Sequence, residues 1–249
     1  MPKSENFFVY GKKPVEETLT EKAKQVDKIF IKNSISPSSY KDLYETASMN
    51  RIPLVTVPEA KLLNLVGRVN HQGFVALISK IEYSNFFDWI ETQNLASNPA
   101  VLLLDGIEDP HNLGAILRTA AAAGISAVIV PTQNQSPVNA TVFKTSAGTA
   151  GRIPIIRVHD TNQGIKDLKL AGFKILGLDA SAKNGIWETS FNAPTAFLIG
   201  NEGRGISKSI MKSCDELIKL PMENNVESLN ASVTAALVSY EWKRQKSII

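Results

Sequence analysis

Residues 195–207 read TAFLIGNEGRGIS, an apolar run that passes directly into a loop with three glycines. The run is apolar on both faces over 196–199, which is typical of a strand buried inside a parallel sheet. Glycines in the loop permit positive φ and a close approach of the backbone to a ligand. The loop matches neither the G-x-G-x-x-G pattern nor a Walker loop. Taken alone, it is best interpreted as a tight structural turn.

Similar apolar runs on either side of this segment predict five further strands: Val101–Leu104, Ala127–Val130, Ile153–Val158, Phe173–Leu178 and Leu217–Leu220. Helical patterns at Leu113–Ala123, Ile165–Leu170 and Leu229–Arg244 separate several of them. Buried strands alternating with helices indicate an α/β fold with a parallel sheet covered by helices. The last helix carries an apolar stripe, which we expect to lie in the core: Leu229, Val233, Leu237, Val238 and Tyr240.

A second strand-to-helix junction lies at residues 104–120, LDGIEDPHNLGAILRTA. Asn112 suits the N-cap of the helix, because its side-chain oxygen can accept a free backbone N–H. Arg118 follows inside an otherwise apolar helix, where an unpaired buried guanidinium would be costly. It therefore either has a partner or a cavity, or faces the solvent.

A third junction lies at residues 217–233, LIKLPMENNVESLNASV. Ser228 is the expected N-cap of the last helix, and Asn230 falls in its first turn, where backbone donors are free. Asn224 can adopt a positive φ more easily than most residues, so it suits a tight loop.

The three loops follow strands of one parallel sheet, so they can meet at its carboxyl edge, where α/β proteins bind ligands. Together they supply five polar side chains: Asn112, Arg118, Glu202, Ser228 and Asn230. The sequence contains no Ser-His-Asp set, no paired-carboxylate signature and no cluster with metal-ligand spacing. The expected chemistry is the positioning of a reactive small molecule and an anionic substrate.

The first third of the chain predicts a separate small α/β unit, with a helix beginning near Pro14, strands at 29–31, 52–57 and 74–78, and a helix at 39–50. Residues 1–80 carry 12 Lys and Arg against 8 Asp and Glu, a charge of +4, whereas residues 81–249 carry 15 against 16, a charge of −1. An anionic partner would be drawn to the N-terminal third, although ordinary surface lysines explain a modest excess equally well.

Composition narrows the class of protein. Of the 249 residues, 43% are hydrophobic and 20% charged, which excludes intrinsic disorder. No apolar run is long enough for a membrane helix, and the N-terminus does not resemble a secretory signal. The single cysteine, Cys214, allows no internal disulfide and fits a reducing compartment, so we expect a cytoplasmic protein.

The three junctions resemble the motifs of the SpoU (TrmH) branch of the SPOUT RNA methyltransferases. The similarity extends to residues 10–15, YGKKPV, and 71–76, HQGFVA, which resemble parts of the family's substrate-binding domain. Three ordered motifs with an accessory domain form a specific signal that covers almost the whole chain.

The resemblance implies transfer of a methyl group from S-adenosylmethionine to a ribose 2′-hydroxyl of structured RNA, by a homodimer and without a metal. It implies an L30e-like RNA-binding domain over 1–80, a linker over 81–98, and over 99–249 a methyltransferase domain whose C-terminal segment forms a trefoil knot. Gly200, Leu220 and Leu229 are then expected to line the cofactor pocket. Arg118 would stabilise the developing alkoxide, within a polar shell of Asn112, Glu202, Ser228 and Asn230.

The L30e-like domain favours ribosomal RNA, with a guanosine of 23S rRNA as the expected target. Transfer RNA is the nearest alternative. A protein of another class, a ribosome-assembly factor that binds RNA without catalysis, would keep the same fold. Departures from the family pattern are Asn224 in place of glycine, Ala231 in place of valine and Thr149 in place of alanine, and none of them removes an expected contact.

Overall fold

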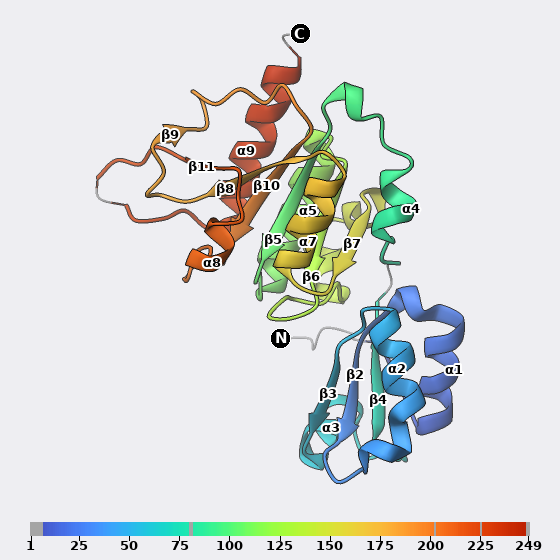
Figure 1. Ribbon diagram of the computed structural model, residues 1–249. Helices are drawn as coiled ribbons and strands as arrows, with labels where there is room; N and C mark the ends of the chain where they lie inside the picture. The colour runs from blue at the N-terminus through green and yellow to red at the C-terminus, as the bar shows by residue number, and fades with distance from the viewer. Residues whose placement is uncertain (1–6, 80–81, 202, 225, 248–249) are drawn as a thin grey trace. The chain divides into compact units, whose positions relative to one another are not determined.

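The computed structural model describes residues 7–79, 82–201, 203–224 and 226–247 (Figure 1). The chain divides into two compact units. Unit 1 contains the chain up to Tyr83 together with Pro137–Thr141, and unit 2 contains Ser84–Ser136 and the chain from Val142 onward.

Unit 1 is built on a four-stranded sheet in the order β1-β4-β2-β3. Its strands are β1 (Phe7–Tyr10), β2 (Val26–Lys32), β3 (Leu54–Val57) and β4 (Phe74–Ile78). β4 is antiparallel to β1 and β2, and β2 is parallel to β3. The sequence predicts β2, β3 and β4 but not β1, because Phe7 and Tyr10 at its two ends are exposed and the strand lacks a continuous buried face.

Three helices accompany this sheet: α1 (Lys12–Lys22), α2 (Lys41–Met49) and α3 (Glu59–Val66). Short 3₁₀ turns occupy Ala23–Gln25 and Pro37–Tyr40. Val15 and Leu19 of α1 and Leu43 of α2 pack with Ile29 and Ile31 of β2 in a hydrophobic core. Burial of side chains of this size contributes about 1.5–3 kcal/mol each, so this core stabilises unit 1.

The segment Pro137–Thr141 belongs to unit 1 although it is distant from the rest of the unit in sequence. The Ser79 hydroxyl donates a hydrogen bond of 2.8 Å to the carbonyl oxygen of Val138. The backbone N–H of Val138 donates to the Tyr83 hydroxyl at 3.2 Å, and that hydroxyl donates to the buried carboxylate of Asp27. These hydrogen bonds fix the segment to the end of β4 and to Tyr83.

Unit 2 contains a seven-stranded sheet in the order β7-β6-β5-β10-β8-β11-β9, and all its strand pairs are parallel. The strands are β5 (Ala100–Asp105), β6 (Ala127–Pro131), β7 (Ile155–Val158), β8 (Lys174–Leu178), β9 (Asn184–Gly185), β10 (Thr195–Gly200) and β11 (Glu216–Lys219). The predicted parallel α/β fold is confirmed. The sequence does not predict β9, because this two-residue strand contains no apolar run. The trefoil knot stays a prediction.

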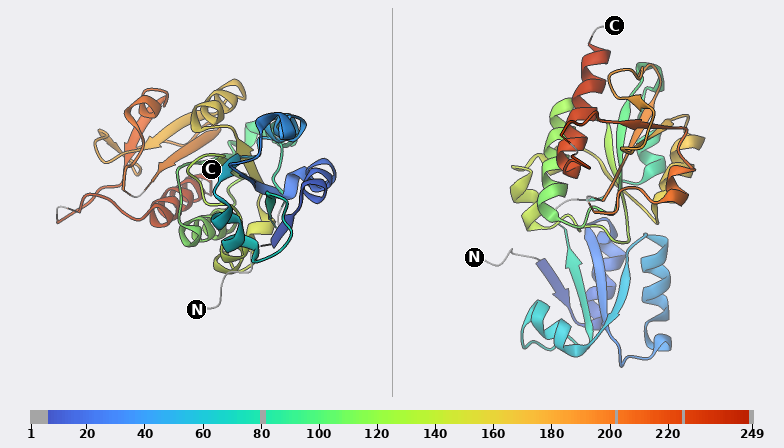
Figure 2. Two further views of the ribbon diagram at one scale, coloured as in Figure 1. Left: turned by 90° about the horizontal axis from the view of Figure 1, so that it is seen from below. Right: turned by 90° about the vertical axis from the view of Figure 1, so that its left-hand side faces the viewer.

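Helices cover both faces of this sheet. α5 (Pro110–Ala123) and α9 (Ala231–Lys246) lie side by side on one face, and α7 (Thr161–Leu170) and α8 (Lys208–Met211) lie on the other (Figure 2, left). α6 (Ala140–Thr145) begins in the segment that belongs to unit 1 and continues into unit 2, which also contains the 3₁₀ turns Leu95–Ser97 and Thr149–Arg152. Within the described residues, no helix is long and apolar enough to cross a membrane.

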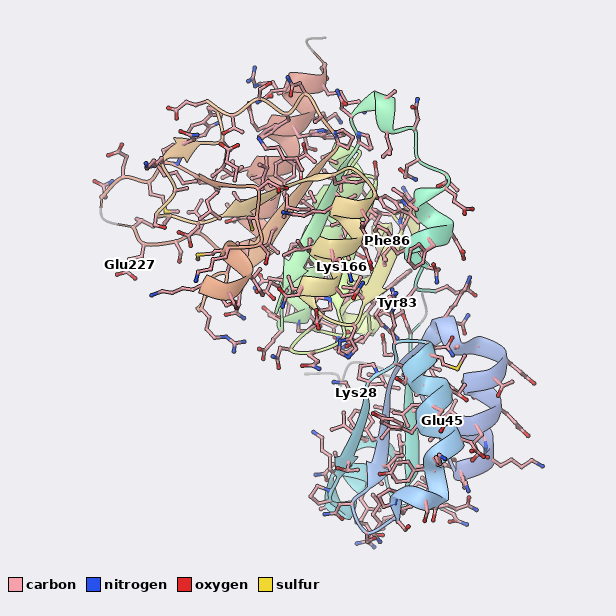
Figure 3. All side chains as sticks on the ribbon, in the orientation of Figure 1. Lys28, Glu45, Tyr83, Phe86, Lys166 and Glu227 are labelled. Atoms are coloured by element: carbon pink, nitrogen blue, oxygen red, sulfur yellow. The ribbon has the colours of Figure 1, made fainter. Side chains whose placement is uncertain are left out.

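The short helix α4 (Phe86–Ile90) packs into the core of unit 2. Phe86 and Trp89 are buried there, and the Trp89 ring lies 6.1 Å from the ring of Phe173. The side chain of Phe86 is labelled in Figure 3. Unit 2 therefore begins at Ser84 and includes most of the stretch 81–98 that the resemblance implies to be a linker.

The apolar stripe of the last helix is not wholly in the core, although the sequence predicted that it would be. Val238 is buried, but Val233, Leu237 and Tyr240 are 45%, 39% and 49% exposed. α9 packs against α5 and β10, and the side that carries Ala235 and Val238 is the buried one. The remaining apolar side chains consequently form an exposed row spaced at about one helical turn.

Candidate functional site

A cavity of about 300 Å³ lies beyond the carboxyl ends of β8, β10 and β11, beside the start of α9. Its apolar lining includes Leu178, Ile199, Leu220, Met222 and Leu229, and Gly200 contributes backbone. The structure thus brings the three residues expected to bind a cofactor, Gly200, Leu220 and Leu229, into one cavity, and Ser228 joins them. We call this the first cavity.

The loop after β10 folds back on itself to form one wall of the first cavity. A Cβ atom added to Gly200 would lie 2.4 Å from the carbonyl carbon of Gly205 and 2.6 Å from its oxygen. Contacts this short are sterically impossible, so the loop requires glycine at this position. The N–H of Gly205 donates to the carbonyl oxygen of Asn201 at 2.8 Å, and Gly205 itself has a φ of 61°.

Asn201 fixes this loop to the loop after β5. Its side-chain amide donates to the carbonyl oxygen of Gly106 at 2.8 Å, while its Oδ1 accepts from the N–H of Gly203 at 2.9 Å. Arg204 Nη2 lies 3.1 Å from Glu108 Oε1 in an exposed ion pair between the same two loops. The first two motifs are therefore joined through named hydrogen bonds.

The junctions at residues 104–120 and 217–233 meet at the starts of α5 and α9. Asn230 Nδ2 donates to Asn112 Oδ1 at 3.0 Å. Two predicted caps are corrected: the N-cap of α5 is Asp109, which accepts from the N–H of His111, and the N-cap of α9 is Asn230, which accepts from the N–H of Ser232. Proline favours the first helical position, so α5 begins at Pro110 rather than after Asn112.

The other predicted site residues lie in different surroundings. Arg118 is exposed on α5, does not line the first cavity, and has no hydrogen bond or ion pair to any residue that the structure describes. Glu202 lies outside the described residues. Asn224 has a φ of 55°, which confirms that asparagine occupies a left-handed position in the third motif.

Sequence reasoning overlooked part of the cavity lining. Asp179 and Ala180, which follow β8, and Thr234 of α9 also line the first cavity. The predicted strand 173–178 ends at the same edge of the sheet as the three motifs, so its following loop could have been included on topology alone. Thr234 carries no comparable signal.

The corrected cap leads to a prediction about stability. Asn230→Ala is expected to lower the free energy of unfolding by about 1 kcal/mol, because the helix loses its capping acceptor. Asn230→Asp retains that acceptor and should change the stability by only a few tenths of a kcal/mol. Urea denaturation measures both. Ser228→Ala is the matched control and should leave stability unchanged; a loss equal to that of Asn230→Ala would restore Ser228 as the cap.

The fold and the first cavity define an α/β protein that binds a small organic ligand at the carboxyl edge of a parallel sheet. The model of the SpoU rRNA Methylase family matches residues 99–240, and a model described as RNA 2′-O ribose methyltransferase substrate binding matches residues 8–84. The chain belongs to the SpoU methylase family and is an RNA methyltransferase.

Individual proteins agree with this assignment. The chain is 37% identical over 243 residues to a Staphylococcus epidermidis protein that carries the name TrmH family tRNA/rRNA methyltransferase, with 97% of each chain covered. Its fold is similar to that of the SpoU methyltransferase AviRb from Streptomyces viridochromogenes in complex with AdoMet, with a TM-score of 0.62, 23% identity, and 98% and 92% of the two chains covered. The fold is also similar to a solved structure that concerns the 2-OH methylation of C/U34 on tRNA. The TM-score is 0.57 and the identity 22%, and the alignment covers 61% of this chain and 99% of the other.

Proposed function

We propose that this protein transfers a methyl group from S-adenosylmethionine to a ribose 2′-hydroxyl of ribosomal RNA, with a guanosine of 23S rRNA as the target, in the cytoplasm. The observation that carries the proposal is the meeting of the three junctions: Gly200, Leu220 and Leu229 line one cavity, and Asn112 of the 104–120 junction is hydrogen-bonded to Asn230 of the 217–233 junction. Transfer RNA is the second candidate, because the name of the S. epidermidis relative includes both RNAs.

The first cavity suits S-adenosylmethionine in both shape and polarity. Leucine, isoleucine and methionine side chains offer an apolar surface to an adenine ring, and the Gly200–Gly205 loop presents backbone groups without intervening side chains. Asp179 and Glu227 add negative charge for a cofactor whose net charge is positive. Glu227 follows β11 in the loop that leads to α9 (Figure 3). The cofactor supplies an activated methyl group when it is bound.

The protein side chains then position the ribose. An arginine guanidinium offers hydrogen-bond donors and no acceptor, so we assign Arg118 to the substrate phosphate and to the negative charge that develops on the 2′-oxygen. Its exposure leaves it accessible to a macromolecular substrate. Asn112, Ser228 and Asn230 orient the acceptor, and Glu202 is assigned to the same polar shell by its motif position alone.

We assign binding of the RNA substrate to unit 1. Its exposed Lys13, Lys61 and Arg68 have no ion pair among the residues covered by the structure. Replacing all three with glutamine should weaken RNA binding and reduce the slope of log affinity against log salt by about 0.7–0.9 for each phosphate that is no longer neutralised. Filter binding at several salt concentrations measures both quantities.

The matched control replaces three exposed lysines of unit 2, Lys166, Lys183 and Lys212, with glutamine. It changes the net charge equally but should retain most of the affinity and the salt slope. If the two triple variants changed the affinity and the salt slope equally, unit 1 would not be the RNA-binding unit.

We also propose that the protein is a homodimer, joined through the exposed row on α9. Val233, Leu237 and Tyr240 form a contiguous apolar strip of the kind that marks protein–protein contacts. Leu237→Glu should convert a dimer of about 54 kDa, twice 27.2 kDa, into a 27.2 kDa monomer in sedimentation velocity experiments. Leu170→Glu, at a leucine 79% exposed on α7, is the control and should remain dimeric. A wild-type monomer would exclude the homodimer.

Mapping 2′-O-methylation in ribosomal and transfer RNA from a deletion strain tests the proposed reaction. Loss of one modified guanosine in 23S rRNA is the expected result, and restoration by the gene but not by the Arg118→Ala variant would link that loss to catalysis. Loss of a tRNA site would select the second candidate. Unchanged methylation in both RNAs would support the non-catalytic assembly factor.

A further inference from the structure

A second cavity, of about 310 Å³, lies beyond the carboxyl ends of β5, β6 and β10, beside the start of α7. Its lining combines the apolar side chains of Pro131 and Ile210 with a set of polar ones: Asp105, Asn134, Asp160, Asn162, Asn201 and Arg204. Gly200, Leu220 and Leu229, assigned above to the cofactor, do not line it, and neither do Asn112, Arg118, Ser228 and Asn230. The volume is at the lower end of the range of about 300–1,000 Å³ for ligand pockets, so it suits a single ring system.

The second cavity adjoins the first. Asn201, Arg204 and Gly205 line both of them, so the loop after β10 is the wall between the two. Hydrogen bonds join the residues of this lining: the side-chain amide of Asn201 donates to the carbonyl oxygen of Gly106 at 2.8 Å, and the Thr161 hydroxyl donates to Asp105 Oδ1 at 2.6 Å. A ligand here would therefore enter a preformed site close to the cofactor, with little ordering cost.

The charges in the second cavity disfavour an anionic ligand. Asp105 accepts a 2.6 Å hydrogen bond from the Thr161 hydroxyl, and Asp160 caps α7 by accepting from the N–H of Gln163 at 2.8 Å. That hydrogen bond is the main cause that lowers the pKa of Asp160, so its carboxyl is ionised at neutral pH. The cationic group of the described lining, Arg204, is paired with Glu108. A phosphate would meet net negative charge.

The same groups favour a neutral ligand that is rich in N–H donors. A carboxylate is an acceptor with room for about four hydrogen bonds, so Asp105 keeps free capacity beyond Thr161. Guanine presents a ring N–H and an amino group side by side, a pair that matches a carboxylate. Uracil offers a single N–H on that edge. Arg204 adds a planar guanidinium on which a base can stack. No set of three His, Cys, Asp or Glu side chains suited to a metal ion occurs in the described part of the chain.

We propose that the second cavity binds an unpaired guanine base of the substrate RNA, with Asp105 as the principal acceptor. This inference rests on the proposed function, since it names the part of the RNA that the site recognises. Sequence-specific recognition of RNA usually reads unpaired bases on their Watson–Crick edges. The base would lie on the other side of the Asn201–Gly205 loop from the cofactor. Its binding would therefore position the RNA beside the first cavity.

Binding of guanosine, inosine and uridine to the full-length protein, followed by ligand-observed NMR, tests the proposal. Inosine lacks the amino group of guanosine. Guanosine should bind, inosine should bind about 5- to 150-fold more weakly, the range for removal of a bidentate base contact, and uridine should bind most weakly. Equal affinity for the three nucleosides, or no binding of guanosine, would overturn the proposal.

Variants of cavity residues test whether guanosine binds in the second cavity. Asp105→Asn keeps an oxygen for Thr161 but replaces the second acceptor with a donor. It should weaken guanosine binding and raise the KM for RNA by about 5- to 150-fold, the range expected when a bidentate base contact is removed. Asn162→Trp fills the cavity from an exposed position, so it should have the same effect with little risk to folding. Asp88→Asn, at an exposed site on α4, is the matched control and should bind like the wild type.

S-adenosylmethionine binding and methyl transfer to RNA are measured in the same preparations. Normal cofactor binding with an unchanged KM for RNA in both cavity variants would overturn the guanine site and leave the proposed function standing. Absence of methyl transfer by the wild-type protein would instead defeat the proposed function.

Discussion

Gly200→Ala is expected to abolish measurable binding of S-adenosylmethionine and to lower the free energy of unfolding by at least about 1–3 kcal/mol, the usual cost of overpacking. The new methyl group would lie 2.4–2.6 Å from three backbone atoms of Gly205 and Ile206. Backbone cannot rotate away as a flexible side chain can, so the loop must open. Isothermal titration calorimetry with the cofactor and thermal unfolding measure the two effects.

Gly203→Ala provides the control within the same loop. The nearest atom to its added Cβ is Asn201 Oδ1 at 3.6 Å, an ordinary contact. This variant should bind the cofactor nearly as well as the wild type. If Gly200→Ala also did so, the Gly200–Gly205 loop would not form the wall of the cofactor site.

Arg118→Ala is expected to reduce turnover by about 10²–10³-fold, the usual effect of removing one donor to a developing oxyanion. The side chain is exposed and makes no ion pair with the residues that the structure describes, so the unfolding free energy should change by less than about 0.5 kcal/mol. Cofactor affinity should be preserved because Arg118 does not line the first cavity. Single-turnover methylation with labelled cofactor separates chemistry from binding.

Two further variants sharpen this test. Arg118→Lys keeps the charge but loses the planar fork of donors, and should restore turnover only in part. Lys166→Ala removes an exposed cation from α7, on the opposite face of the sheet, and should leave turnover unchanged (Figures 2 and 3). Near-normal turnover of Arg118→Ala would show that this arginine does not act on the substrate.

The buried elements are those that the sequence predicts well. β5, β6 and β10 are recognisable because their residues are apolar on both faces, and α5 and α7 separate them at the expected places. Elements without a continuous apolar pattern are not recognisable in this way: β1 is half exposed, and β9 is held by its pairing with β11. The local pattern of apolar residues indicates which segments are buried. These two strands depend on tertiary contacts instead.

The candidate site shows the same division. Gly200, Leu220 and Leu229 belong to motifs that follow buried strands, and the structure places them in one cavity. The observed caps lie a few positions from the expected ones, because a cap depends on where the helix begins and Pro110 begins α5 early. The exposure of Val233, Leu237 and Tyr240 could not be deduced from spacing, since an apolar row suits the core and a protein interface equally well.

The composition of unit 1 has a consequence for biosynthesis. Unit 1 includes Pro137–Thr141, whose Val138 is held by Ser79 and Tyr83. A ribosome that has just completed Tyr83 must therefore still make β5, α5 and β6 before this missing segment emerges. At about 5–20 residues per second, that interval lasts several seconds. During it the hydrogen bonds of Ser79 and Tyr83 to Val138 cannot form, so the two units are expected to mature together rather than one after the other.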